Sequence, residues 1–355
     1  MALTDAAPSA KLWTSVQGHI FGGGSFFQRG EQRFVLADMD LDAEAPRVAL
    51  TDLWFLAHGF NVDPNDPTRA VVFEKKGPGA AYVDLRARTV LQKIDGPKRR
   101  HFYGHGAYSA DGTLLYATES FLDQDHRGAL IVRDAATFEE LGEVPTFGAS
   151  PHDCMLIDDG KVMVVANGGG RMQGGARPCV TYVDVASARL LEKVELKTAR
   201  YNTGHLAMGT DGALAVVSAP RDGLPTRTPR LGAVSLRTPG KPLVTMSKPK
   251  RVVDKMKGET LSVAVHGDRV VATQPDGNMV TVWSLAQTKL VKKIASLQGP
   301  RGVCLTLEED AFVVSHNVDG QMALTLLSTE DLSPVRHVPG SFTSGSHIYA
   351  HPLAA

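Results

Sequence analysis

A hairpin led by a histidine repeats along the chain and restricts its fold more than any other feature of the 355 residues. Each copy reads as a histidine, a short alternating strand, an Asp-Gly or Asp-Pro type of turn and a second apolar strand. The four copies are AHGFNVDPNDPTRAVVFEK from Ala57, GHGAYSADGTLLYATES from Gly104, PHDCMLIDDGKVMVVANGG from Pro151 and GHLAMGTDGALAVVSAP from Gly204. Such turns between apolar runs are typical of tight β-hairpins.

Two further strand-like runs follow each hairpin. Examples are AAYVDLRARTVLQKI, GALIVRDAATFEELGEV and CVTYVDVASARLLEKVEL, and the aspartate in VDL, RDA and VDV is expected to begin the turn into the fourth strand. Four short antiparallel strands per repeat are typical of a β-propeller blade.

Two later repeats, TLSVAVHGDRVVATQPDG and GVCLTLEEDAFVVSHNVDG, keep the pattern but have Thr260 and Gly302 in place of the histidine. The C-terminal GSHIYAHP has an inner strand without a hairpin, and the N-terminal LWTSVQGHIFGG and QRFVLADMD supply the missing strands. Equivalent positions are 58, 105, 152, 205, 260, 302 and 347. We therefore predict an all-β fold, a single seven-bladed propeller over residues 1–355, with its last blade closed by both termini.

The first strand of a propeller blade lines the central channel, so residues at equivalent strand starts form a ring at its mouth. Five of the seven starts are histidine, and His316 ends a second strand near the same mouth. The predicted metal ligands are His58, His105, His152, His205, His347 and His316. Imidazole-rich sites suit copper, iron, zinc or nickel better than calcium or magnesium, and copper or iron is favoured here, with zinc possible.

Other second strands should return polar groups beside this ring. The predicted supporting residues are Glu74, Glu119, Asn167, Gln274 and His19. A purely structural alternative stays open, because repeats copy a strand-capping histidine whether or not it binds anything.

Weaker features accompany the repeat. The glycine-rich NGGGRMQGGARP from Asn167 joins two strands, opens no helix, and is expected to be a loop over the channel. Arg99, Arg100, His101 and Tyr103 precede His105 and are expected in a basic loop at the channel rim. Three cysteines without a CxxC motif predict no disulfide framework, although Cys154 lies close enough to His152 to share the channel.

Charge and hydropathy exclude some classes of function. Lys plus Arg and Asp plus Glu number 38 each, which argues against nucleic-acid binding. No apolar run reaches 18 residues, so no membrane span is expected. The first residues, MALTDAAPSAKLWTSV, lack the order of an intact signal peptide. We expect a monomer, the default for a closed propeller.

The segments GHGAYSADGTLLYATES, SPHDCMLIDDGKVMVVANGG and TGHLAMGTDG resemble an uncharacterised bacterial family of exported β-propellers, known only as a domain of unknown function with YVTN-like repeats. The resemblance covers nearly the whole chain, departs at TGH, and has a shorter loop after VVANGG. It implies a periplasmic protein whose gene often neighbours imelysin-type iron-uptake genes. The histidine ring is also loosely similar to the copper-cluster propeller of nitrous oxide reductase.

Three functions follow as hypotheses. The chain is a periplasmic metal-binding propeller acting in metal handling or redox, with periplasmic metal-uptake or redox proteins as partners. Alternatively it is a metal-dependent enzyme, an oxidoreductase or less favourably a lactonase-like hydrolase using metal-bound water. The third hypothesis is a non-catalytic scaffold for protein interactions.

Overall fold

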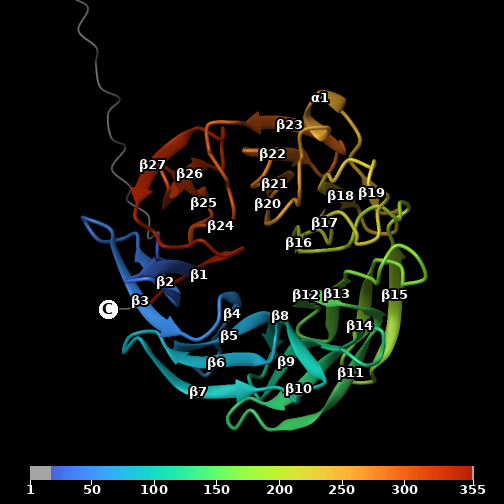
Figure 1. Ribbon diagram of the computed structural model, residues 1–355, viewed down its shortest axis with the longest axis horizontal. Coiled ribbons are helices and arrows are strands. Elements are labelled where there is room, and N and C mark those ends of the chain that lie inside the picture. The colour runs from blue at the N-terminus through green and yellow to red at the C-terminus, as the bar shows by residue number, and fades with distance from the viewer. Residues whose placement is uncertain (1–16, 354–355) are drawn as a thin grey trace, which may run out of the picture.

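A computed structural model describes residues 17–353. Within this range the chain folds into strands β1 to β28 and one short helix, α1 (Lys250–Val253). Figure 1 shows the sheets arranged around a central axis, with the chain passing from one to the next in order. The arrangement is an all-β, propeller-like fold, and the predicted hairpins are present at all four quoted repeats.

The strands form five four-stranded sheets and one eight-stranded sheet within the described residues. The four-stranded sheets are β28(Ile348–His351)-β1(His19–Gln28)-β2(Glu31–Asp40)-β3(Arg47–Leu53), β12(Pro151–Ile157)-β13(Val162–Asn167)-β14(Cys179–Asp184)-β15(Arg189–Glu195), β16(Leu206–Met208)-β17(Leu214–Ser218)-β18(Ala233–Arg237)-β19(Val244–Thr245), β20(Val263–His266)-β21(Arg269–Gln274)-β22(Met279–Ser284)-β23(Lys289–Ile294) and β24(Val303–Leu305)-β25(Ala311–Val318)-β26(Gln321–Ser328)-β27(Pro334–Pro339).

The eight-stranded sheet contains two consecutive sets of four strands. They are β4(Ala57–Asp63)-β5(Asp66–Gly77)-β6(Gly79–Asp84)-β7(Thr89–Asp95) and β8(Arg100–Tyr108)-β9(Leu114–Phe121)-β10(Arg127–Asp134)-β11(Glu140–Ala149). The two sets join where the long strand β5 reaches β8, with Lys75 opposite Tyr103 and Gly77 opposite Phe102.

The two ends of the described chain share one sheet. Strand β28 pairs antiparallel with β1, so that His19 lies opposite His351 and Gly22 opposite Ile348. The C-terminal strand therefore supplies the innermost strand of the N-terminal sheet, as the sequence predicts. Residues 12–16 of the expected first strand lie outside the described range.

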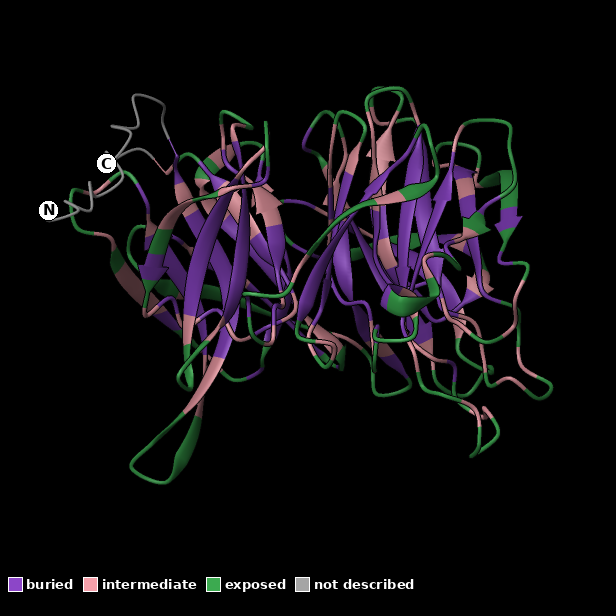
Figure 2. Cartoon of the chain, turned by 90° about the horizontal axis from the view of Figure 1, so that it is seen from above, coloured by how far each residue is buried: buried purple, intermediate pink, exposed green. Residues whose placement is uncertain are grey.

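The sheets bury both faces near the centre and expose their outer strands. In β13 every residue of VMVVAN is buried, because Val165 packs with Leu130 of one neighbouring sheet and Val164 with Val216 of the other. The outer strand β15 is mostly exposed. Figure 2 shows the same gradient, with buried strand centres and exposed loops and rims. A strand covered on both faces reads as a continuous apolar run, which matches the second-strand sequences.

The predicted turn aspartates act as expected. Asp84, Asp134 and Asp184 end the third strands, and each carboxylate accepts hydrogen bonds from backbone N–H groups two or three residues on. For Asp184 the bond from the Ser187 N–H is 2.7 Å long. These Asx turns direct the chain into the fourth strand.

The three cysteines are free thiols, in line with the predicted lack of a disulfide framework. Between residues 17 and 353, no helix has the length and hydropathy that crossing a bilayer requires.

Candidate metal centre

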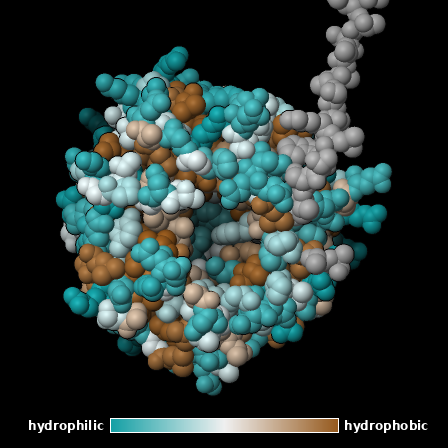
Figure 3. Space-filling view, turned by 180° about the vertical axis from the view of Figure 1, so that it is seen from behind, coloured by the Kyte–Doolittle hydropathy of each residue, from teal (hydrophilic) through white to brown (hydrophobic). Residues whose placement is uncertain are grey.

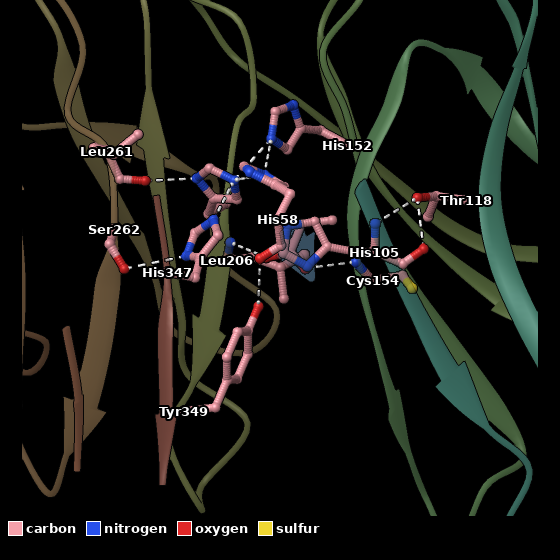
Figure 4. A network of polar contacts seen from close by, with 12 residues as sticks. His58, His105, Thr118, His152, Cys154, Leu206, Leu261, Ser262, His347 and Tyr349 are labelled. Carbon is pink, nitrogen blue, oxygen red and sulfur yellow. Dashed lines mark hydrogen bonds and ion pairs between the residues drawn. The ribbon is translucent and has the colours of Figure 1, made fainter. Parts of the chain in front are cut away.

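Five histidines meet on the central axis, each carried by the innermost strand of a sheet or by the residue just before it. His58 and His152 are the second residues of β4 and β12, His105 lies inside β8, and His205 and His347 directly precede β16 and β28. All five are buried, with at most 8% of their surface exposed. Figure 4 shows the labelled rings of His58, His105, His152 and His347 close together.

Glycines beside the histidines allow this close approach. Gly104 has φ +118°, and a Cβ atom there would lie 2.5 Å from His58 Cδ2. A Cβ on Gly59 would lie 2.2 Å from the Gly104 carbonyl oxygen. Because larger residues would separate the inner strands, the HG and GHG sequences are requirements of a narrow channel.

The Nε2 atoms converge on His205. Its Nε2 lies 2.7 Å from that of His152, 2.8 Å from that of His347 and 3.2 Å from that of His58. The Nε2 atoms of His58 and His152 are 3.3 Å apart. Metal–nitrogen bonds of 2.0–2.1 Å in a tetrahedral site place nitrogens about 3.3 Å apart. The four separations given above equal this spacing or fall below it.

Four of the five histidines form a group able to hold one metal ion. Potential ligand atoms of His58, His105, His205 and His347 all lie within 4.8 Å of one another. His152 adjoins this group through its contacts with His58 and His205.

A hydrogen bond at Nδ1 fixes the orientation of the His205 ring, and a carboxylate lies beside Nδ1 of His105. His205 Nδ1 lies 2.6 Å from the Leu261 carbonyl oxygen and must donate, so the Nε2 of the neutral ring carries a lone pair. His105 Nδ1 lies 3.3 Å from Asp153 Oδ1, and its buried Nε2 has no hydrogen-bond partner among the described residues. Outer partners of this kind are typical of metal-ligating histidines.

His347 has a similar outer partner. Its Nδ1 lies 3.3 Å from Ser262 Oγ, which accepts a hydrogen bond from the Val303 N–H at 3.2 Å. The serine hydroxyl is thus held in place beside the imidazole.

Burial keeps these imidazoles neutral. Desolvation is the main cause that lowers the pKa of His105, and it lowers the pKa values of the other four histidines well below 6.5. The ammonium of Lys75 lowers all five further, whereas Asp153 opposes the shift only at His105. Neutral imidazole is the form that binds a metal ion.

Cavities lie against the cluster. A vestibule of about 450 Å³ is lined by His152, His205 and Lys75, among others. An inner cavity of about 280 Å³ is lined by His105, His205 and His347 together with Asp153 and Tyr349. His205 reaches both, and Figure 3 shows the surface hollowed at the centre of one face.

His316 is placed apart from this cluster. Its Nε2 lies 2.8 Å from Thr325 Oγ1, and its ring is 5.8 Å from that of His337. These contacts belong to the sheet of β24 to β27, where a cavity lies between His316 and the outer strand β27. The sequence predicted His316 as a metal ligand beside the other histidines, but these contacts hold it within its own sheet instead.

The predicted supporting residues also serve other parts of the fold. The carboxylate of Glu119 pairs with Arg100 and Arg133, and that of Glu74 accepts from the Gly79 N–H. The side-chain amides of Asn167 and Gln274 donate to the hydroxyls of Thr181 and Thr281, respectively. The imidazole of His19 pairs with the carboxylate of Asp38. Second-strand side chains stand perpendicular to their sheet and point between neighbouring sheets, so a position near the mouth does not bring them to the histidines.

The groups that do support the histidines come from elsewhere. Leu261 and Ser262 follow Thr260, one of the two start positions that lack a histidine. Asp153 follows His152 directly, and strand alternation turns it to His105 and to the Leu206 N–H, which it accepts at 2.9 Å. The sequence Pro151-His152-Asp153 offered one signal for such a supporting group, because a carboxylate there directly follows a repeat histidine.

An all-β, propeller-like fold with a buried cluster of histidines able to hold a metal ion defines the class of this protein. The chain belongs to the family described as protein of unknown function (DUF1513), whose model matches residues 52–347. No curated protein matches the chain. Among solved structures it is similar to hydrazine synthase of Kuenenia stuttgartiensis, at 14% identity and a TM-score of 0.66, over 92% of this chain and 100% of that chain. At that identity the likeness shows the fold alone.

Proposed function

We propose that the chain is a single seven-bladed propeller, with blade starts at 58, 105, 152, 205, 260, 302 and 347, that binds a transition metal ion at its central histidines. Its proposed role is metal handling or redox chemistry. The observation that carries the proposal is the convergence of three Nε2 atoms on the Nε2 of His205, whose lone pair is fixed by the Leu261 carbonyl.

Hydrogen bonding alone accounts poorly for this arrangement. A neutral imidazole has one lone pair, which suits one strong hydrogen bond. His205 has three Nε2 atoms within 3.2 Å, and any N–H groups they direct at it would also crowd one another. One metal cation can accept the lone pairs of several nitrogens at once. Hydrogen bonds among the histidines alone cannot satisfy all of these nitrogens.

The donor set favours copper or iron, with zinc possible. Imidazole suits all three metals, and copper(II) has the highest affinity of the divalent first-row series for a given nitrogen site. Cys154 and Cys304 line the inner cavity, but burial raises the pKa of the Cys304 thiol to about 12 and that of Cys154 well above its ordinary value. Protonated thiols are poor ligands, so the nitrogen donors should set the preference.

The vestibule supports a second candidate, a metal-dependent enzyme. A cavity of about 450 Å³ that touches His152 and His205 has room for a small substrate beside a bound ion. An oxidoreductase fits copper or iron, and a lactonase-like hydrolase fits zinc-bound water. The family resemblance adds the periplasm as the proposed compartment and metal-uptake or redox proteins as partners of a monomer.

Metal content tests the proposal. Purified protein is loaded in turn with copper, iron and zinc salts, desalted and measured by elemental analysis beside His205→Ala and the double variant His105→Ala/His152→Ala. Near-stoichiometric metal in the natural chain and loss in both variants is the expected result. The matched control is His337→Ala, an exposed histidine of β27, which should retain the metal.

Absence of metal from every loaded sample of the natural chain would overturn the proposal and favour the scaffold hypothesis. Colour and an electron paramagnetic resonance signal would favour redox metals, whereas a colourless zinc form with esterase activity would favour the hydrolase.

A further inference from the structure

The vestibule above the histidines carries unbalanced positive charge. Four basic side chains line it, two of them buried or half-buried at its wall and two exposed, and they are Lys75, Arg221, Lys76 and Arg171. Two carboxylates line it as well, half-buried Glu259 and exposed Asp222. The lining thus has two more positive than negative charges before any metal ion is added.

Lys75 is the clearest sign of a missing partner. It lies in β5 opposite Tyr103, and within residues 17–353 its ammonium makes no hydrogen bond or ion pair. Desolvation lowers its pKa to about 8, the nearby charges of Lys76 and Arg301 lower it too, and Glu259 opposes them. This half-buried ammonium lies in the cavity wall without a carboxylate in contact, so an anion that enters the cavity can pair with it.

Thr260 provides an independent observation. It lines the vestibule, is 3% exposed, and its Oγ1 is buried without a hydrogen-bond partner among the described residues. Buried hydroxyls are normally hydrogen-bonded, so an orphan hydroxyl in a cavity wall points to a ligand that accepts from it.

Arg221 lines the same vestibule and is buried in its wall. Its guanidinium donates to the carbonyl oxygens of Gly170, Arg171, Ala176 and Ala199, and no carboxylate of the described chain pairs with it. These bonds hold the glycine-rich loop, residues 168–176, in place beside the cavity. The loop is therefore a fixed wall, and the buried guanidinium adds a permanent positive charge to it.

We infer that the vestibule is a binding site for a small oxyanion, a carboxylate or a phosphate, held by Lys75 and Thr260 on the open side of the histidine cluster. The anion site itself is argued from the lining of the vestibule. Its place beside a metal ion rests on the proposed metal-binding function. A positively charged entrance repels bare metal cations and concentrates anions, so species that enter here should be negatively charged. A cavity of about 450 Å³ suits a small molecule rather than a polymer.

Isothermal titration of oxalate and of inorganic phosphate into metal-free and metal-loaded protein tests the inference. We compare the natural chain with Lys75→Met, Thr260→Val and the control Lys98→Met, an exposed lysine outside the vestibule. Saturable 1:1 binding should weaken about tenfold or more in Lys75→Met, less in Thr260→Val and not at all in Lys98→Met. The tighter of the two probes assigns the carboxylate or the phosphate class.

Metal content of the same samples separates this inference from the proposed function. Anion binding that depends on Lys75 in a protein that retains no metal would support the anion site and overturn the metal site. Retained metal with no saturable binding of either anion, or with equal binding in Lys75→Met and Lys98→Met, would overturn the anion site alone. Circular dichroism spectra must match those of the natural chain, and Thr260→Val serves as the second variant if Lys75→Met fails to fold.

Discussion

Two buried polar clusters of this molecule differ in whether their charges balance within the chain. Glu119, fully buried, pairs with Arg100 at 2.5 Å and with Arg133 at 2.6 Å, and Arg100 also pairs with Glu140. Two guanidinium groups therefore meet two carboxylates, and the charges balance. The central histidines face one another instead, with a single carboxylate, Asp153, in contact and Lys75 nearby.

The comparison separates buried polar groups that stabilise the fold from buried polar groups that bind a ligand. A buried ion cluster whose charges balance within the chain needs no ion from solution, and removing one partner mainly affects stability. A cluster of lone pairs with no counter-charge is incomplete until a ligand arrives, and removing a member should mainly affect binding. The predictions below test this separation, in order of decreasing expected effect.

Acid should destabilise the metal-free protein through the histidines more than any single substitution does, because five groups act together. Unfolded imidazoles take up protons below their ordinary pKa of 6.5, whereas the buried ones stay neutral to lower pH. The unfolded state therefore binds more protons just below pH 6.5, and the free energy of unfolding falls as the pH falls through that window. Above about pH 7.5 these groups should contribute almost no pH dependence, because the unfolded imidazoles are then neutral as well.

Urea unfolding of metal-free protein at pH 7.5, 6.5 and 5.5 measures this effect. His205→Ala should show a smaller fall between pH 6.5 and 5.5 than the natural chain, whereas Glu119→Gln should keep the full fall. A natural chain with a flat profile over this range would show that the histidines are not buried as neutral groups.

Glu119→Gln should lower the free energy of unfolding by about 3–5 kcal/mol, because two buried guanidinium groups lose their shared charge. The control is Glu143→Gln, which removes the exposed pair with Arg127 and should change stability by no more than about 1 kcal/mol. Urea unfolding at pH 7.5 compares them. Metal retained per folded molecule should be unchanged in both, and metal loss in Glu119→Gln at full folding would contradict the separation.

His205→Ala should abolish the stabilisation that metal gives to the natural chain. A ligand present at 100 times its Kd raises the free energy of unfolding by about 2.7 kcal/mol. Thermal unfolding with and without copper should therefore show a shift in Tm for the natural chain and for His337→Ala, and none for His205→Ala. An equal shift in His205→Ala would mean that copper binds elsewhere.

The sequence predicted the architecture better than the site, and particular residues show why. Turn aspartates such as Asp84 and repeat histidines such as His105 act through local backbone geometry, so their spacing reveals strands, hairpins and the order of sheets. The ring of blade-start histidines follows from that order.

Contacts across sheets could not be read from spacing in the same way. The positions of His316 and Glu119 were misjudged because a side chain on a second strand points between neighbouring sheets, whichever face of its own sheet it occupies. The partners of His205 and His105 are a backbone carbonyl and a carboxylate on neighbouring sheets, and only the packing angle between sheets brings them together.

Asp153→Asn offers the smallest and sharpest test of the comparison, because Asp153 is the one carboxylate in contact with the histidine cluster. Its Oδ1 lies 3.3 Å from His105 Nδ1, and its Oδ2 accepts from the Leu206 N–H. Loss of such an outer carboxylate typically weakens metal binding about 10- to 100-fold. Asparagine keeps the shape and can still accept from Leu206, so stability should change little while copper affinity, measured by competition with a chelator, falls. A large loss of stability at unchanged copper affinity would instead place Asp153 with Glu119, as a structural carboxylate of the fold.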